Sequence, residues 1–139
     1  LLYIFERFWQ EILRFSRRTE SQINHWAARY GYKDRGEEIL KEAKHGANGR
    51  YACINLTNTD TIEFRVFRGT LKYNTVIATL QFVANLCRVA ISLPEYRIQE
   101  FSWPALIEAL TQDNCPELVQ YLKERNLYVN EPVTAEREV

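Results

Sequence analysis

The chain has 139 residues, of which 46% are hydrophobic and 26% are charged, so it is long enough to form a globular domain with a buried core. Eighteen Lys and Arg residues balance eighteen Asp and Glu residues, which argues against a general attraction to nucleic acid or to anionic membranes. The three cysteines are widely spaced without a CxxC pair, so they predict neither a disulfide framework nor a zinc site. This pattern favours a reducing, cytoplasmic location.

The first residues of the chain do not resemble a natural start. No Met is present, even at position 1, and Glu6 and Arg7 interrupt the apolar run too early for a secretory signal. We therefore expect the chain to be a fragment, with the missing part of the same domain on its N-terminal side.

Three helices are predicted before residue 46. Apolar residues at helical spacing indicate an amphipathic helix from the first residue to about Ser16. The pattern Thr19-x-x-Gln22 is typical of a capping box, and it predicts a second helix that ends at Gly31. A third, largely solvated helix is expected over residues 36–45.

β-Branched and aromatic residues dominate the next two segments, 50–56 and 61–68, which flank the polar loop 57–60. This pattern predicts an antiparallel β-hairpin. A two-stranded hairpin is marginally stable by itself, so we expect other strands to extend it into a larger sheet. The expected N-terminal part of the domain is the natural source of those strands.

Three further helices are predicted after the hairpin. The apolar segment Val76–Ile91, capped by Asn74 or Thr75, is expected to be a central core helix, because polar residues interrupt it too often for a membrane span. Ser102 and Asn114 are predicted to cap two more helices. The fold class that follows is α+β and mostly helical, with about six helices packed around one antiparallel hairpin.

Glu63 and Arg65 are the strongest candidates for chemistry, because alternate residues of a strand share one face. The opposite face is predicted to enter the core through Ile62, Phe64 and Val66. An even number of loop residues would place Glu63 opposite Ile54 and Arg65 opposite Ala52. Arg50 would then join them on the same face.

Two interpretations of this charged face remain open from the pattern. Arginine binds phosphate or carboxylate through two parallel hydrogen bonds, and a glutamate binds hard cations such as Mg²⁺, so the face suits an anion held together with a metal. The same pattern also describes an ordinary charged, solvent-exposed face of an antiparallel sheet. The alternation of residue types does not distinguish them.

A longer run of residues resembles a known family. The run RYACINLTNTDTIEFRVFRGTLKYNTVIATLQFV, Arg50–Val83, resembles the C-terminal signature of the amidoligases, which are glutamine synthetase-like carboxylate–amine ligases. The segment IEFR, Ile62–Arg65, followed by a helix that opens at Asn74, is more distantly similar to an R-I-E-x-R strand of glutamine synthetase. Thr61 departs from that pattern, because glutamine synthetase has another arginine there.

The resemblance implies roles for individual residues. Glu63 would bind the metal, and Arg65 would be a catalytic and cofactor-binding residue that contacts the phosphoryl group or the substrate carboxylate. Arg50 would be a second catalytic and nucleotide-binding arginine, with a looser match. Asn55 would support cofactor binding. Arg17 and Arg18 belong either to this site or to a solvated helix end, where cations favour the helix dipole.

The resemblance also implies a function. Residues 1–129 would form the C-terminal part of an amidoligase-like catalytic domain, with a disordered tail over 130–139 and a hairpin that belongs to a glutamine synthetase-like sheet. The enzyme would use ATP and Mg²⁺, or Mn²⁺, to join a small-molecule or peptide carboxylate to an amine through an acyl phosphate. The fragment by itself is expected to be inactive. Homo-oligomerisation is open, and neither nucleic acid nor membrane is an expected partner. The alternative is a non-catalytic helical protein-interaction module.

Overall fold

The computed structural model describes residues 1–27, 29–31, 35–44, 52–58 and 60–128. The chain divides into two compact units, Leu1–Thr70 (unit 1) and Leu71–Val139 (unit 2). The described residues form eight α-helices and one two-stranded antiparallel sheet, which confirms the mostly helical α+β class. The assignment of residues 1–129 to one amidoligase-like domain stays a prediction, and the predicted tail lies outside the described residues.

The first helical segment of unit 1 is divided into α1 (Leu2–Arg7) and α2 (Trp9–Ser16). The backbone leaves the helical conformation at Phe8, where φ is −108° and ψ is 34°, so the prediction of one continuous helix is wrong. Most residues of the predicted apolar stripe are nevertheless buried. An apolar pattern of this kind is the same for one helix or for two, which is why it could not show the break.

The predicted capping box is confirmed at the start of α3 (Glu20–Trp26). The Thr19 hydroxyl accepts a hydrogen bond from the Gln22 backbone N–H, and the Gln22 side chain accepts one from the Thr19 N–H. The helix ends at Trp26 and not at Gly31, so its predicted length is wrong. Gly31 lies beyond the helix and has a φ of +88°, a left-handed conformation that glycine adopts readily. The predicted third helix is confirmed as α4 (Gly36–Lys44).

A buried ion pair explains why the chain leaves the helix before residue 29. The Glu6 side chain is 1% exposed and accepts hydrogen bonds from the Arg29 guanidinium at 2.6 and 2.9 Å. It also accepts one from the Tyr30 backbone N–H, and the Tyr30 hydroxyl donates to the Ile54 carbonyl. The Arg29 guanidinium lies over the Trp9 ring. These contacts connect α1, α2 and the chain after α3 with the first strand.

The hairpin consists of β1 (Ile54–Asn55) and β2 (Glu63–Phe64). Asn55 lies opposite Glu63, and Ile54 lies opposite Phe64. The predicted strands were therefore too long, and the predicted register is wrong by one residue. A one-residue change of register exchanges the faces of one strand relative to the other, so Asn55 and not Ile54 shares the face of Glu63.

Fewer residues in and around β2 face the core than predicted. Val66 is buried and Phe64 is half-buried, but Ile62 is 49% exposed. The Phe64 ring lies 6.0 Å from the ring of Phe5 in α1. Pairing begins only at Glu63, so Ile62 belongs to the loop, where the alternation of a strand does not hold.

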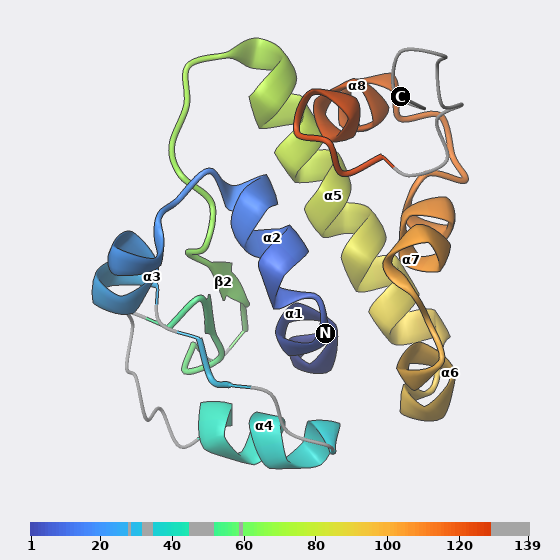
Figure 1. Ribbon diagram of the computed structural model, residues 1–139. Coiled ribbons are helices and arrows are strands. Elements are labelled where there is room, and N and C mark those ends of the chain that lie inside the picture. Colours follow the sequence, from blue (N-terminus) through green and yellow to red (C-terminus); the bar gives the residue numbers. More distant parts are fainter. Residues whose placement is uncertain (28, 32–34, 45–51, 59, 129–139) are drawn as a thin grey trace, which may run out of the picture. The chain divides into compact units, whose positions relative to one another are not determined.

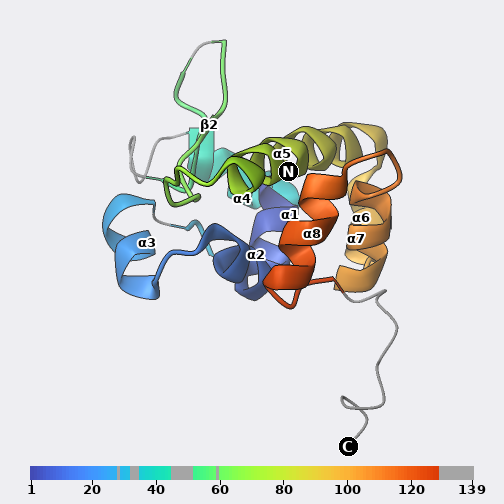
Figure 2. The ribbon, with the colours of Figure 1, turned by 90° about the horizontal axis from the view of Figure 1, so that it is seen from above.

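Unit 2 contains α5 (Tyr73–Ser92), α6 (Glu95–Gln99), α7 (Trp103–Leu110) and α8 (Pro116–Glu124). Both α7 and α8 pack against α5 (Figure 1), and Figure 2 shows them on the same side of it. The packed face of α5 contains Thr75, Ala78, Phe82, Leu86 and Val89. Predicted helices after the hairpin are thus confirmed, and the short α6 is an addition to them.

The predicted start and burial of α5 need correction. The N-cap is Lys72 without a side-chain hydrogen bond, and the Asn74 side chain donates to the Glu117 carbonyl instead of capping α5. The helix is buried along one face only, because Leu80 and Ile91 are well exposed. By length and composition alone α5 could cross a membrane, a criterion that core helices of soluble proteins also meet.

Two predicted caps give a matched test of local helix stability. The Ser102 hydroxyl accepts a hydrogen bond from the Ala105 N–H at the start of α7, whereas α8 begins at Cys115 and leaves Asn114 outside the cap. We expect Ser102→Ala to lower the free energy of unfolding by about 1 kcal/mol, and Asn114→Ala to lower it much less. Urea denaturation of both variants measures the difference, and equal losses would contradict the assignment of the caps.

Candidate functional site

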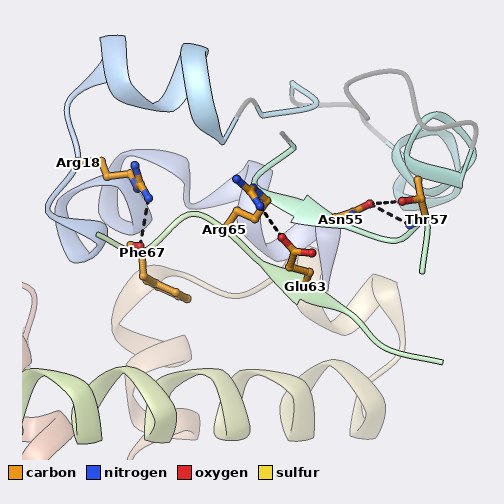
Figure 3. Close-up of polar contacts among 6 residues, drawn as sticks. All are labelled: Arg18, Asn55, Thr57, Glu63, Arg65 and Phe67. Carbon is orange, nitrogen blue, oxygen red and sulfur yellow. Dashed lines mark hydrogen bonds and ion pairs between the residues drawn. The ribbon is translucent and has the colours of Figure 1, made fainter. Parts of the chain in front are cut away.

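Glu63 and Arg65 form a close ion pair on one face of β2. An Arg65 Nη1 donates to the Glu63 Oε1 at 2.6 Å (Figure 3). The two side chains are 39% and 30% exposed, respectively, so solvent reaches the pair. Arg65 directly follows β2, and its N–H still donates to the carbonyl of Cys53, which directly precedes β1, so the alternation continues to Arg65 and places it on the same side as Glu63.

The Glu63 carboxylate has further hydrogen-bond partners besides Arg65. Hydrogen bonds from Arg65, and to a lesser extent from Asn55 and Asn58, lower the pKa of Glu63 against the opposing effect of desolvation. The Asn55 carboxamide oxygen accepts from the backbone N–H and the hydroxyl of Thr57, which fixes the side chain of this buried residue (Figure 3). Asn55 therefore lies beside Glu63, and its predicted supporting place near the site is consistent with this geometry.

Aromatic packing fixes the orientation of the segment after β2. The Phe67 ring packs edge-on against Phe15 of α2 at 5.8 Å, and the Arg68 N–H donates to the Ser16 carbonyl. Val66, which directly precedes Phe67, is also buried. With Phe67 and Val66 packed inward, Arg65 remains at the surface of unit 1.

A tight turn at the end of α2 brings more positive charge to the same place. Arg17 has a φ of 62°, a left-handed conformation that is uncommon outside glycine, and the Arg18 N–H donates to the Ser16 hydroxyl. The turn directs the Arg17 side chain to the Arg68 carbonyl and the Arg18 side chain to the Phe67 carbonyl. Both guanidinium groups therefore hold the main chain that follows β2.

Arg18 has an unusual electrostatic environment. Burial, followed by the positive charges of Arg65 and Arg68, lowers its pKa. Its Nε–H is buried and has no hydrogen-bond acceptor among the described residues. Arg18, Arg65 and Arg68 thus form a cluster of like charge, which we call the arginine cluster.

The structure brings together only some of the residues predicted for the site. Glu63, Arg65 and Asn55 lie together, whereas Arg50 lies outside the described residues. The arginine cluster supplies two further cations. The strand pattern predicts Arg68 on the face opposite to Arg65, but the regular strand ends at Phe64, so the alternation does not extend to Arg68. In the sequence, only the two consecutive arginines at the end of a predicted helix indicated that Arg18 could belong to the site.

The described side chains around Glu63 could hold a metal ion only if a second bound molecule supplied further ligands. Within the described ranges, no group of three or more His, Cys, Asp or Glu side chains could hold a metal. Mg²⁺ commonly takes one or two carboxylates and completes its shell with phosphate oxygens and water. Glu63 therefore fits as one protein ligand of a metal that is bound together with a phosphorylated molecule.

Cys53 lies next to this site but does not fit a nucleophile. The Arg65 N–H donates to the Cys53 carbonyl at 2.9 Å, and the cysteine is buried. Burial, with a smaller effect of the Glu6 carboxylate, raises the pKa of its thiol to about 12. The thiol is protonated at neutral pH, and Cys53 packs as a small buried side chain.

We expect the Glu63 carboxylate to titrate below the ordinary glutamate pKa of 4.5. A pKa that is lower in the folded state than in the unfolded chain gives a stabilisation that is complete above the unfolded value. It is lost as the pH falls through the folded pKa. Observing the side-chain carboxyl carbon by NMR measures this midpoint, and Arg65→Gln should move it back towards 4.5. A midpoint in the unaltered chain at or above that value would contradict the geometry.

Comparison with known proteins identifies no relative of this chain. No family model, no curated protein and no solved structure matches the chain.

Proposed function

We propose that this chain forms one side of the active site of an ATP-dependent carboxylate–amine ligase of the amidoligase type. Such an enzyme transfers the γ-phosphoryl group of ATP to a carboxylate, which releases ADP and forms an acyl phosphate. An amine then attacks the acyl carbon, and inorganic phosphate leaves as the amide or isopeptide bond forms. The hairpin would belong to a glutamine synthetase-like sheet, to which other strands would contribute.

The observation that carries this proposal is the group formed by Glu63, Arg65 and Asn55 within a run that resembles the amidoligase signature. An acid, a guanidinium and an amide converge there on one partly exposed face. Their chemistry suits a bound phosphoryl group, because each offers a ligand for a phosphate oxygen or for its counter-ion. The lowered pKa of Glu63 agrees with a carboxylate that is surrounded by hydrogen-bond donors.

Each residue has a definite task in this proposal. Arg65 would neutralise the charge that develops on the transferred phosphoryl group, and it would exchange its contact with Glu63 for phosphate oxygens. Glu63 would then be available as a ligand for Mg²⁺ or Mn²⁺, which supplies further positive charge when bound. Asn55 would hold Glu63 in place. Arg50 remains a proposed second contact for the nucleotide.

A second candidate function is a non-catalytic protein-interaction module. It is favoured by one observation, which is that Glu63 and Arg65 satisfy one another as an ordinary surface ion pair would. In that case the charged face would contact a partner protein, and ATP would not be consumed.

Trapping with hydroxylamine separates these two functions. Hydroxylamine replaces the amine and converts an acyl phosphate into a stable hydroxamate. We expect the natural full-length protein, supplied with Mg-ATP and a panel of amino acids and dicarboxylates, to form ADP and hydroxamate in equal amounts. ADP formation without any hydroxamate would contradict the acyl phosphate, and no ATP consumption with any carboxylate of the panel would favour the interaction module.

A further inference from the structure

The arginine cluster of unit 1 contains three positive charges, of which only that of Arg65 has a carboxylate partner among the described residues. Arg65 has an ion pair with Glu63, but neither Arg18 nor Arg68 has one among the described residues. Arg18 donates instead to the Phe67 carbonyl at 3.4 Å, which is an uncharged acceptor. The positive charges of Arg65 and Arg68 are close enough to lower the pKa of Arg18, so the cluster gains from a bound counter-charge.

The positions of the guanidinium groups are set by different elements. Arg18 follows the turn at the end of α2, and Arg65 follows β2 directly. Figure 3 shows both guanidinium groups on one side of the segment that runs from Glu63 to Phe67, with the Phe67 ring on the other side. The backbone of Arg68 is fixed by Ser16 and by Arg17, while its side chain is exposed. The main chain of the site is therefore fixed. A ligand would replace the contacts that Arg18 makes with the Phe67 carbonyl and Arg65 makes with Glu63.

We propose that Arg18, Arg65 and Arg68 form a binding site for a phosphoryl oxyanion with at least two negative charges. Guanidinium groups match phosphate oxygens through paired, charge-assisted hydrogen bonds. Three cations suit a polyphosphate or an acyl phosphate better than a single carboxylate, which has half the charge or less. The site extends the proposed function, on which it rests for the source of the phosphoryl group, and it adds Arg18 and Arg68 as binding residues.

Binding of inorganic pyrophosphate to the 139-residue chain in chloride buffer tests the site. We expect saturable binding by isothermal titration calorimetry with a dissociation constant on the order of millimolar, as a few exposed charge-assisted hydrogen bonds allow. Added sodium chloride should weaken it, because salt screens exposed charges. Acetyl phosphate serves as the second probe. Stronger binding of pyrophosphate assigns the site to a nucleotide polyphosphate chain, and stronger binding of acetyl phosphate assigns it to an acyl phosphate.

Arg68→Gln is the decisive variant, because it removes an exposed side chain and leaves the backbone contacts of residue 68 in place. We expect it to weaken pyrophosphate binding about tenfold. Arg18→Gln should weaken binding at least as much, with circular dichroism used to verify its fold. Arg97→Gln removes an exposed arginine from α6 of unit 2 and should leave the affinity unchanged. Equal effects of Arg68→Gln and Arg97→Gln, or no saturable binding of either probe, would overturn the site.

The outcomes also separate this inference from the proposed function. Pyrophosphate binding that depends on Arg68, in a full-length protein that forms no hydroxamate, would support the oxyanion site and contradict the ligase. Hydroxamate formation in a protein whose affinity for pyrophosphate does not depend on Arg68 would support the ligase and contradict the oxyanion site.

Discussion

Replacing Arg29 with alanine is expected to lower the free energy of unfolding by about 3 kcal/mol, the largest loss of stability that we predict for one ion pair in this chain. The Glu6 side chain is 1% exposed, and the guanidinium of Arg29 supplies its charged partner. Without that partner the carboxylate keeps only the hydrogen bond from the Tyr30 N–H. A buried charge that is left unpaired costs far more than an exposed one.

Arg35→Ala is the matched control for this prediction. The contact between Arg35 and Glu37 is also 2.6 Å long, but both side chains are 68% exposed, so its loss should cost less than about 0.5 kcal/mol. Urea denaturation of both variants compares pairs that differ mainly in burial. Replacing Glu6 and Arg29 together with methionine should restore much of the stability, because it leaves no unpaired charge. Similar losses of unfolding free energy in Arg29→Ala and Arg35→Ala would show that burial does not increase the contribution of the Glu6–Arg29 pair to stability.

Elements that depend on neighbouring residues were predictable from the sequence. The capping box at Thr19 and the cap at Ser102 are local hydrogen bonds, and the structure has both. The end of α3 was not predictable, because it depends on the contact of Arg29 with Glu6, which lies 23 residues earlier. The sequence contains the partners of that contact, but no spacing rule joins them.

The hairpin shows the same limit at the candidate site. Its existence, its antiparallel pairing and the shared face of Glu63 and Arg65 follow from residue types and from the alternation of a strand. Its register depends on where pairing stops and the loop begins, which the sequence pattern does not specify. Arg18 joins Arg65 because of a left-handed turn at Arg17, a conformation that the sequence of α2 does not indicate.

Replacing Glu63 with alanine tests the central claim, which is that Glu63 and Arg65 belong to the active site of an ATP-dependent ligase. In the natural full-length protein we expect Glu63→Ala to reduce ATP turnover with substrate by about a hundredfold or more, because a ligand of the metal and the anchor of Arg65 are both lost. The side chain is partly exposed, so the fold should tolerate the change. Glu108→Ala, which removes an exposed carboxylate from α7, is the matched control and should retain full turnover.

The most direct measurement is therefore the rate of ADP release from Mg-ATP by the full-length protein, with hydroxylamine and the carboxylate that gives most hydroxamate. We predict that Glu63→Ala loses this rate while Glu108→Ala keeps it. Turnover by Glu63→Ala at the unaltered rate would contradict the assignment of Glu63 and Arg65 to a ligase active site.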